Sequence, residues 1–112
     1  MTAFVKSVTF YCEEPLVVAA FWAAALGSDV DEDSTPERAW VEPAGWGGPS
    51  LWSRRVSSPK TAKNRQHFDL RAIGDLTDEV ERLRRLGATQ VRVYEDHVAM
   101  ADPEGNEFCV EA

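Results

Sequence analysis

The chain has 112 residues and a formal net charge of −7 at neutral pH. This length suits one compact domain, residues 1–112, with a core large enough to fold without disulfides. The negative charge argues against nucleic-acid partners, because phosphate binding needs clustered Lys and Arg. No segment has the roughly 20 apolar residues of a membrane span, and the N-terminus has no signal-peptide pattern. Cys12 and Cys109 lack metal-clip spacing, so we expect free thiols, no membrane partner and a cytoplasmic location.

In the first half, residues 4–12 alternate between apolar and polar, which predicts a strand with one face in the core. The polar face carries Ser7, Thr9 and Tyr11. Pro15 suits the first turn of a helix, where its missing N–H costs nothing, and Gly27 ends the helix. We expect its buried stripe to be formed by Leu16, Phe21 and three alanines, Ala20, Ala23 and Ala24. Strand patterns follow at residues 39–42 and 51–56.

In the second half, residues 67–72 form a strand pattern with His67 and Asp69 on its polar face. Asp75 is the expected N-cap of a helix that ends at Gly87. The expected buried stripe of this helix is Leu76, Val80, Leu83 and Leu86. Three more strand patterns occupy residues 89–94, 98–101 and 107–110, and a Pro- and Gly-containing turn at residues 102–106 joins the last two.

The second half nearly repeats the first, with an offset of 60 positions between residues 7–27 and 67–87. A repeat of this length predicts two copies of one supersecondary unit that are paired around a shared site. Each half is read as β-α-β-β, with a further strand in the second half. Both helices are expected on the apolar strand faces, which leaves the polar faces open to a ligand.

Residues 43–68 contain no acidic side chain, in contrast to the rest of the chain. The basic residues inside this segment are Arg54, Arg55, Lys60, Lys63 and Arg65. A solvated surface is one interpretation, since charge runs are usually exposed. A landing site for a small anion is the other.

The ordered motifs resemble a known family. Phe21-Trp22 with Leu26-Gly27, the segment from Pro59 to Leu70, Leu86-Gly87-Ala88 and the segment from Asp102 to Cys109 are similar to glyoxalase-like members of the vicinal oxygen chelate superfamily. This superfamily also includes bleomycin-resistance proteins and extradiol dioxygenases. The resemblance implies an α+β fold of two βαβββ modules, about residues 1–58 and 59–112, that form a curled, cup-shaped mixed sheet with outer helices. It also implies a homodimer.

The resemblance further implies four metal-ligand positions in the cup, two on the first strands and two on the last strands of the modules. In this chain they fall on Ser7, Trp52, His67 and Cys109. His67 is a strong ligand and Cys109 is one as a thiolate, whereas Ser7 and Trp52 are poor ligands. A divalent metal is therefore not a firm expectation, and His67 and Cys109 would hold it if one binds.

His67, assisted by Asp69, is the main candidate for catalysis. Asp69 lies two positions after His67 on the same strand face, so its carboxylate could orient the imidazole of a general base. The alternative is a hydrogen-bonded structural histidine. Cys109 is read either as a small hydrophobic residue or as a nucleophile. His97 is expected in a solvated turn.

The tryptophans point to binding rather than catalysis. Trp22 is expected to pack in the core, whereas Trp40, Trp46 and Trp52 fall on or between the strands of the first half. Their planar side chains suit stacking on an aromatic ligand, or else they fill a core or a dimer seam.

The sequence thus predicts a protein that sequesters or carries a planar or anionic small molecule in a cup with a degenerate metal site. The expected lining is Ser7, Thr9, Tyr11, Trp52, Arg54, His67, Asp69 and Cys109. The alternative is a lyase, isomerase or dioxygenase of the same superfamily that uses His67, assisted by Asp69, with or without a metal. A regulatory module that acts through a protein partner is a third reading.

Overall fold

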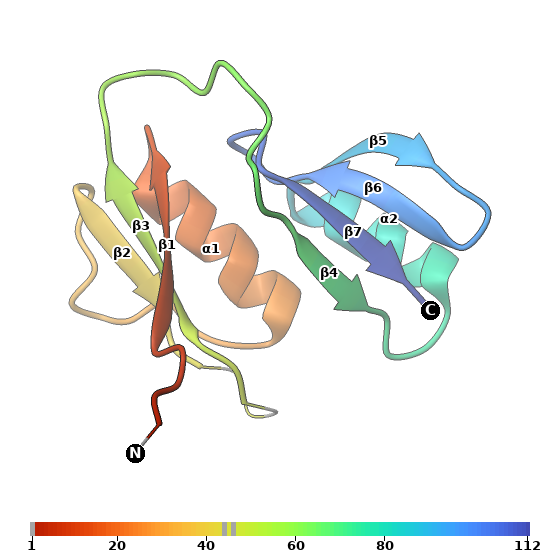
Figure 1. Cartoon of the computed structure of the whole chain (residues 1–112), viewed down its shortest axis with the longest axis horizontal. Coiled ribbons are helices and arrows are strands. Elements are labelled where there is room, and N and C mark those ends of the chain that lie inside the picture. Colours follow the sequence, from red (N-terminus) through yellow and green to blue (C-terminus); the bar gives the residue numbers. More distant parts are fainter. Residues whose placement is uncertain (1, 44, 46) are drawn as a thin grey trace. The chain divides into compact units, whose positions relative to one another are not determined.

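The computed structural model describes residues 2–43, 45 and 47–112, which divide into two compact units at residues 1–59 and 60–112 (Figure 1). We call them module 1 and module 2. The division lies one residue beyond the boundary expected from the repeat. Trp46, one of the tryptophans singled out above, lies outside the described residues.

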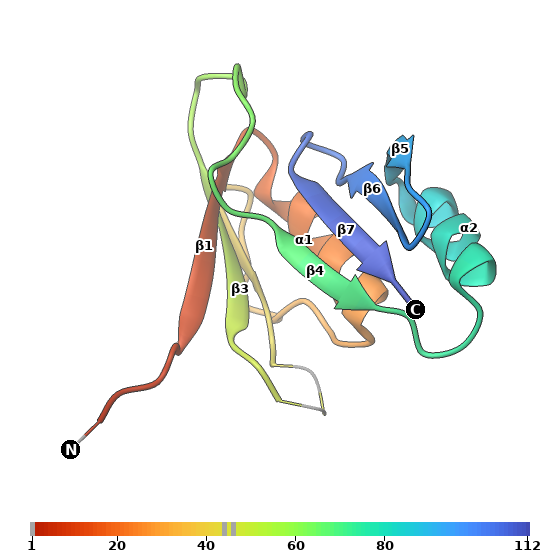
Figure 2. The ribbon, with the colours of Figure 1, turned by 45° about the vertical axis from the view of Figure 1, so that its right-hand side comes forward.

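Module 1 contains strand β1 (Ser7–Cys12), helix α1 (Pro15–Leu26) and strands β2 (Arg38–Val41) and β3 (Ser50–Arg55). The strand order is β1-β3-β2, with β2 antiparallel to β3. Strand β1 is parallel to β3 and lies beside it (Figure 2). An isolated bridge between Val30 and Val41 extends the β2 edge. With a second isolated bridge between Thr35 and Arg38, the acidic segment before β2 contributes two bridges where module 2 has a whole strand.

The core of module 1 is built around Trp22, which is 1% exposed. Its indole is stacked on Phe10 from β1, with ring centroids 6.1 Å apart, and makes an edge contact with Phe21. The helix begins at Pro15 and ends at Gly27, which has the positive φ of 68° expected of a terminating glycine. The prediction that Trp22 is a packing residue is confirmed.

The predicted buried stripe of α1 was wrong at three of its five positions, whereas Phe21 and Ala23 are buried as predicted. Leu16 is 41% exposed, and Ala20 and Ala24 are exposed as well. The buried set is Pro15, Val18, Ala19, Phe21, Trp22, Ala23 and Ala25. Every residue of α1 is apolar, so hydrophobic periodicity gives no face to choose, and packing against the sheet decides.

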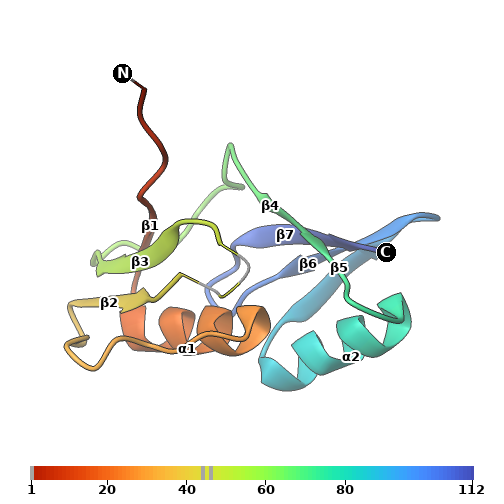
Figure 3. The same ribbon diagram turned by 90° about the horizontal axis from the view of Figure 1, so that it is seen from below.

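Module 2 contains strand β4 (Phe68–Arg71), helix α2 (Leu76–Leu86) and strands β5 (Thr89–Val93), β6 (His97–Ala101) and β7 (Glu107–Glu111). Its strand order is β4-β7-β6-β5, and β4 is parallel to β7. In each module the helix covers one face of its own sheet (Figure 3). The α+β class and the two β-α-β modules predicted from the sequence are confirmed. The described strands form two separate sheets, of three strands in module 1 and four in module 2, instead of the one curled, cup-shaped sheet that the resemblance implied. Module 1 has one strand fewer than the implied βαβββ unit, because the segment before β2 makes only isolated bridges.

Helix α2 follows its sequence pattern closely. The Asp75 carboxylate accepts a hydrogen bond from the Asp78 N–H at 3.0 Å, as expected of an N-cap. Val80 and Leu83 are buried, Leu76 is half-buried, and Leu86 at the end of the stripe is 37% exposed. Neither of the two helices in the described part of the chain is long and apolar enough to cross a bilayer.

The predicted turn at residues 102–106 is also observed. The Asp102 carboxylate is buried and accepts hydrogen bonds from the backbone N–H groups of Glu104 and Asn106. Gly105 has a φ of +84°, which only glycine adopts without strain. Asn64 donates a hydrogen bond from its side-chain amide to the Asn106 side chain at 2.8 Å, which fixes the segment before β4 to this turn.

Candidate functional site

The sheet of module 1 has an open face on the side opposite α1. Strand alternation and register place eight side chains there, and we call them the module 1 face: Ser7, Thr9, Tyr11, Arg38, Trp40, Ser50, Trp52 and Arg54. The residues between them, such as Ala39 and Leu51, are buried. All five predicted lining residues of the first half therefore lie together on one surface.

Two tryptophans form the centre of the module 1 face. Trp40 and Trp52 are direct cross-strand partners, and their rings are stacked with centroids 4.3 Å apart and an interplanar angle of 11°. Thr9 is the partner of Trp52 on its other side. Both indoles are half-buried, so each ring keeps exposed surface that a planar ligand can contact.

Three charged or polar side chains form the next row of this face. Arg38 lies directly opposite Arg54, and Arg54 lies directly opposite Tyr11. All three are exposed. Sequence analysis identified Tyr11 and Arg54 but missed Arg38. The alternation of residues 38–41 places Arg38 on the same strand face as Trp40, and this pattern could have identified Arg38.

A pair of carboxyl groups lies on the other side of Trp40. The pKa of Asp31 is lowered, first by a hydrogen bond with Glu42, and the same hydrogen bond raises the pKa of Glu42. Glu42 is therefore the carboxyl of the pair that takes up a proton first as the pH falls. Both carboxyls also hydrogen-bond with the Trp40 side chain. This carboxyl pair was not expected from the sequence. The Val30–Val41 bridge brings the two residues together, and no local sequence pattern indicates that bridge.

Module 2 carries a cluster of titratable groups on its corresponding open face. One ligand atom each from His67, Asp69 and Cys109 all lie within 4.8 Å of one another. His67 Nε2 is 3.2 Å from Asp69 Oδ1, and Asp69 is the register partner of Cys109. The register pair Asp69–Cys109 in module 2 corresponds to Thr9–Trp52 in module 1. We call these three residues the module 2 cluster.

The Cys109 thiol is held in its neutral form. Burial raises its pKa, and the nearby Asp69 carboxylate raises it further. The neutral thiol is a weak nucleophile, which counts against a role of Cys109 in nucleophilic catalysis. The exposed His67 and Asp69 are the more accessible members of the cluster.

The donor set of the module 2 cluster fits a divalent metal. One imidazole, one carboxylate and one thiol supply three ligands, the number found in catalytic zinc sites that keep a position open. Binding would release the Cys109 proton, so affinity would rise with pH. Sequence analysis named His67 and Cys109 as potential ligands and missed Asp69 in that role, although its spacing from His67 on one strand was the available signal.

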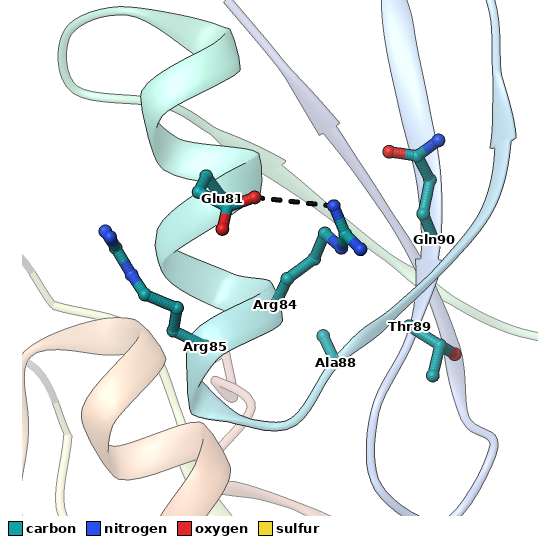
Figure 4. A pocket seen from close by; sticks show the side chains of 6 residues that line it. All are labelled: Glu81, Arg84, Arg85, Ala88, Thr89 and Gln90. Atoms are coloured by element: carbon teal, nitrogen blue, oxygen red, sulfur yellow. Dashed lines mark hydrogen bonds and ion pairs between the residues drawn. The ribbon is translucent and has the colours of Figure 1, made fainter.

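His97 and a surface pocket lie outside the module 1 face and the module 2 cluster. His97, expected in a solvated turn, begins β6, where its half-buried ring is stacked on Tyr94 at 4.4 Å and lies 2.6 Å from the Asp96 carboxylate. An open pocket of about 440 Å³ lies between the end of α2 and β5 (Figure 4). Its charged residues include an ion pair between Arg84 and Glu81, and the module 2 cluster is not part of its lining.

The fold is that of a small α+β protein with two β-α-β modules, each of which has an open sheet face. Comparison with known families makes this specific: the model of the glyoxalase-like domain matches residues 7–111. The chain therefore belongs to the glyoxalase-like domain family, within the vicinal oxygen chelate superfamily. The resemblance inferred from its motifs is confirmed. No match was found among curated proteins.

Solved structures share the fold at low sequence identity. A glyoxalase/bleomycin resistance protein/dioxygenase family enzyme from Burkholderia phytofirmans is 14% identical with a TM-score of 0.78, covering 96% of this chain and 97% of its own. A glyoxalase-related enzyme from Fulvimarina pelagi is 16% identical with a TM-score of 0.74, covering 98% and 88%. A bleomycin-binding protein from Streptomyces verticillus, in complex with copper(II)-bleomycin, is 19% identical with a TM-score of 0.64, covering 100% and 98%.

Proposed function

We propose that this protein is a glyoxalase-like binding protein that sequesters or carries a planar or anionic small molecule. The observation that carries this proposal is the stacked pair of Trp40 and Trp52, which presents half-buried indoles on an open sheet face. Aromatic rings in such a position gain stacking and apolar contact from a planar ligand. The bleomycin-binding structural neighbour supports a binding role on this fold.

Ligand binding can be tested through the tryptophans themselves. Titration with a panel of planar aromatic compounds, copper(II)-bleomycin included, is expected to quench tryptophan fluorescence and raise the melting temperature for at least one compound. Trp52→Ala is expected to weaken that binding by tenfold or more. Phe4→Ala is the matched control, since Phe4 is an aromatic residue that is 87% exposed and lies before β1. Equal binding by wild type and Trp52→Ala would contradict the proposal.

The module 2 cluster supports a second candidate function, an enzyme that uses His67. The 3.2 Å contact between His67 Nε2 and Asp69 Oδ1 would orient the imidazole, so that it can accept a proton from a bound substrate. A lyase, isomerase or dioxygenase reaction would fit this arrangement. If a divalent metal is held by the cluster, it would supply Lewis-acid polarisation of a substrate oxygen.

Metal analysis separates the two candidates. Protein purified without chelator is assayed for bound metal and for thermal shifts with zinc, nickel, manganese and iron. The enzyme candidate predicts near-stoichiometric metal or a shift that His67→Ala and Asp69→Asn each abolish. His97→Ala is the control, because His97 lies outside the cluster. A wild-type protein that neither retains nor responds to metal would leave only a metal-free role for His67.

The remaining parts of the proposal concern domain organisation, oligomeric state, cellular location and ligand type. We propose a single domain, residues 1–112, that forms a homodimer, and light scattering that finds only the monomer mass at high concentration would contradict this. A cytoplasmic location is supported by Cys12 and Cys109, which are not joined in a disulfide. The acidic net charge supports a small-molecule ligand rather than nucleic acid.

A further inference from the structure

We propose that the ligand of the module 1 face is an aromatic carboxylate, with its ring on the tryptophan pair and its carboxylate between Arg38 and Arg54. This inference rests on the proposed binding function and narrows it to one chemical class. It adds Arg38 to the binding residues expected from the sequence and pairs Trp40 with Trp52 as the surface on which the ring stacks. The observations that carry it are the register of β2 and β3 and the charge pattern around the tryptophans.

Arg38 and Arg54 are direct cross-strand partners. They lie on the same face of the sheet as Trp40 and Trp52, two residues further along each strand. Like charges directly opposite each other on a sheet are unfavourable. Neither guanidinium has an ion-pair partner within the residues described, 2–43, 45 and 47–112. An anion between them would remove this repulsion.

The equivalent row of module 2 shows how the same architecture balances charge. There, Arg71 lies opposite Glu111, and the two form an ion pair of 3.2 Å. In module 1, Tyr11 takes the place of Arg71 and Arg54 takes the place of Glu111. The row in module 1 therefore holds positive charge without the acidic partner that its counterpart has.

The dimensions of the sheet match an aromatic carboxylate. Residues two apart on a strand and on the same face are separated by about 6.6 Å, and neighbouring strands by about 4.8 Å. A ring stacked on Trp52 or Trp40 would therefore place a carboxylate attached to it near the arginine row. Arginine binds carboxylates with two parallel hydrogen bonds, which suits a planar group held in one orientation.

The carboxyl pair of Asp31 and Glu42 sets the polarity of the site. Glu42 follows Trp40 by two residues, on the side away from Arg38, and its carboxyl lies within hydrogen-bonding distance of the Asp31 carboxyl. Negative charge on that side repels a carboxylate and favours a hydrogen-bond donor. The anionic end of the ligand is therefore directed to the arginines.

The test uses three probes of known chemistry with the full chain. 2-Naphthoate is a planar anion, 2-naphthamide is its neutral analogue, and cyclohexanecarboxylate is an anion without an aromatic ring. Isothermal titration is expected to show 2-naphthoate binding at least tenfold more tightly than either of the others. This preference is expected to decrease with added salt, because exposed charges are screened.

Variants then assign the preference to residues. Arg38→Gln and Arg54→Gln are each expected to weaken 2-naphthoate binding about tenfold while leaving 2-naphthamide binding unchanged. Arg55→Gln is the matched control, since Arg55 is the next residue on β3 and alternation places it off the module 1 face. Without ligand, Arg38→Gln is expected to keep or raise the melting temperature. A fall would give Arg38 a structural role and overturn the inference.

The outcomes separate the inference from the proposed function. The inference fails if 2-naphthoate and 2-naphthamide bind equally and the arginine variants bind as wild type does. The binding function still stands in that case, provided that Trp52→Ala abolishes the binding of both compounds. If 2-naphthoate does not bind at millimolar concentration, the inference also fails. In that case the proposed function still stands, unless the wider aromatic panel and copper(II)-bleomycin do not bind either.

Discussion

The two modules share a β-α-β plan, but the open faces of their sheets carry different chemistry. The module 1 face has a stacked tryptophan pair beside two arginines that lie opposite each other. The open face of module 2 has the titratable cluster of His67, Asp69 and Cys109 beside an arginine that is paired with a glutamate. The buried positions maintain the fold in both copies, and the open positions are free to specialise. We infer that the first copy serves binding and that the second is the place to look for proton or metal chemistry.

The helices differ in a way that explains where sequence patterns succeed. All residues of α1 are apolar, whereas α2 alternates charged and apolar residues with helical spacing. Periodicity therefore identified Val80 and Leu83 as buried but selected Leu16 incorrectly. A helix without a polar face gives no information on its own orientation.

The largest expected effects test whether the two modules depend on each other for stability. Trp22→Ala in module 1 and Phe108→Ala in module 2 each remove a side chain that is at most 1% exposed. Each is expected to lower the free energy of unfolding by about 3 to 5 kcal/mol. Urea denaturation followed by circular dichroism measures both. One shared transition is expected in each variant, and a second transition confined to the mutated half would show that the modules unfold independently.

The turn glycines offer a smaller effect that should be equal in the two modules. Gly105 in module 2 and Gly48 in module 1 occupy matching turn positions, with φ of +84° and +99°. Replacement of either by Ala is expected to cost about 1 to 2 kcal/mol, because the left-handed region is strained for L-residues. A Cβ at Gly105 would meet only the Lys60 side chain at 3.7 Å, so crowding adds little. Gly45→Ala is the control, since no positive φ is recorded there, and thermal denaturation compares the three.

The helix starts differ between the modules. Helix α2 begins with a side-chain cap from Asp75, whereas α1 begins with Pro15. Asp75→Ala is expected to cost about 1 kcal/mol, because the Asp78 N–H loses its partner. Asp75→Asn keeps an acceptor oxygen and should recover most of that loss. Equal destabilisation by both substitutions in chemical denaturation would contradict the capping role.

The smallest expected effect is a pH dependence above about pH 8.5 that comes from Cys109 in module 2. Burial raises the pKa of Cys109 in the folded state, so the unfolded chain loses this proton first as pH rises above about 8.5. Wild-type stability should therefore fall relative to Cys109→Ala above that pH and keep a constant difference below it. Melting temperatures between pH 7 and 10 measure this. Asp69→Asn should reduce the effect, since the Asp69 carboxylate contributes to the shift.

Local sequence was sufficient for most of the fold. Alternation located the ends of every strand to within one residue, except that β1 begins at Ser7, three residues later than predicted. Asp75, Gly27 and Gly105 marked the ends and turns where the structure has them. The candidate site was predicted less fully. Alternation along the strands placed five residues on one face, and the structure has them there: Ser7, Thr9, Tyr11, Trp52 and Arg54. Arg38 was missed, because a single exposed arginine gains significance only when its cross-strand partner is known.

The sequence by itself determined the α+β class, the repeat and the parity of each strand, because these depend on spacings of two and about four residues within one segment. The tertiary structure decided which face of the apolar α1 is buried and which residues lie opposite each other across strands. The stack of Trp40 on Trp52, the Arg38–Arg54 pair, the Asp31–Glu42 carboxyls and the approach of Cys109 to His67 all follow from strand register or from a single bridge. Such contacts join residues distant in the chain and are set by packing of the whole module, so no local pattern encodes them.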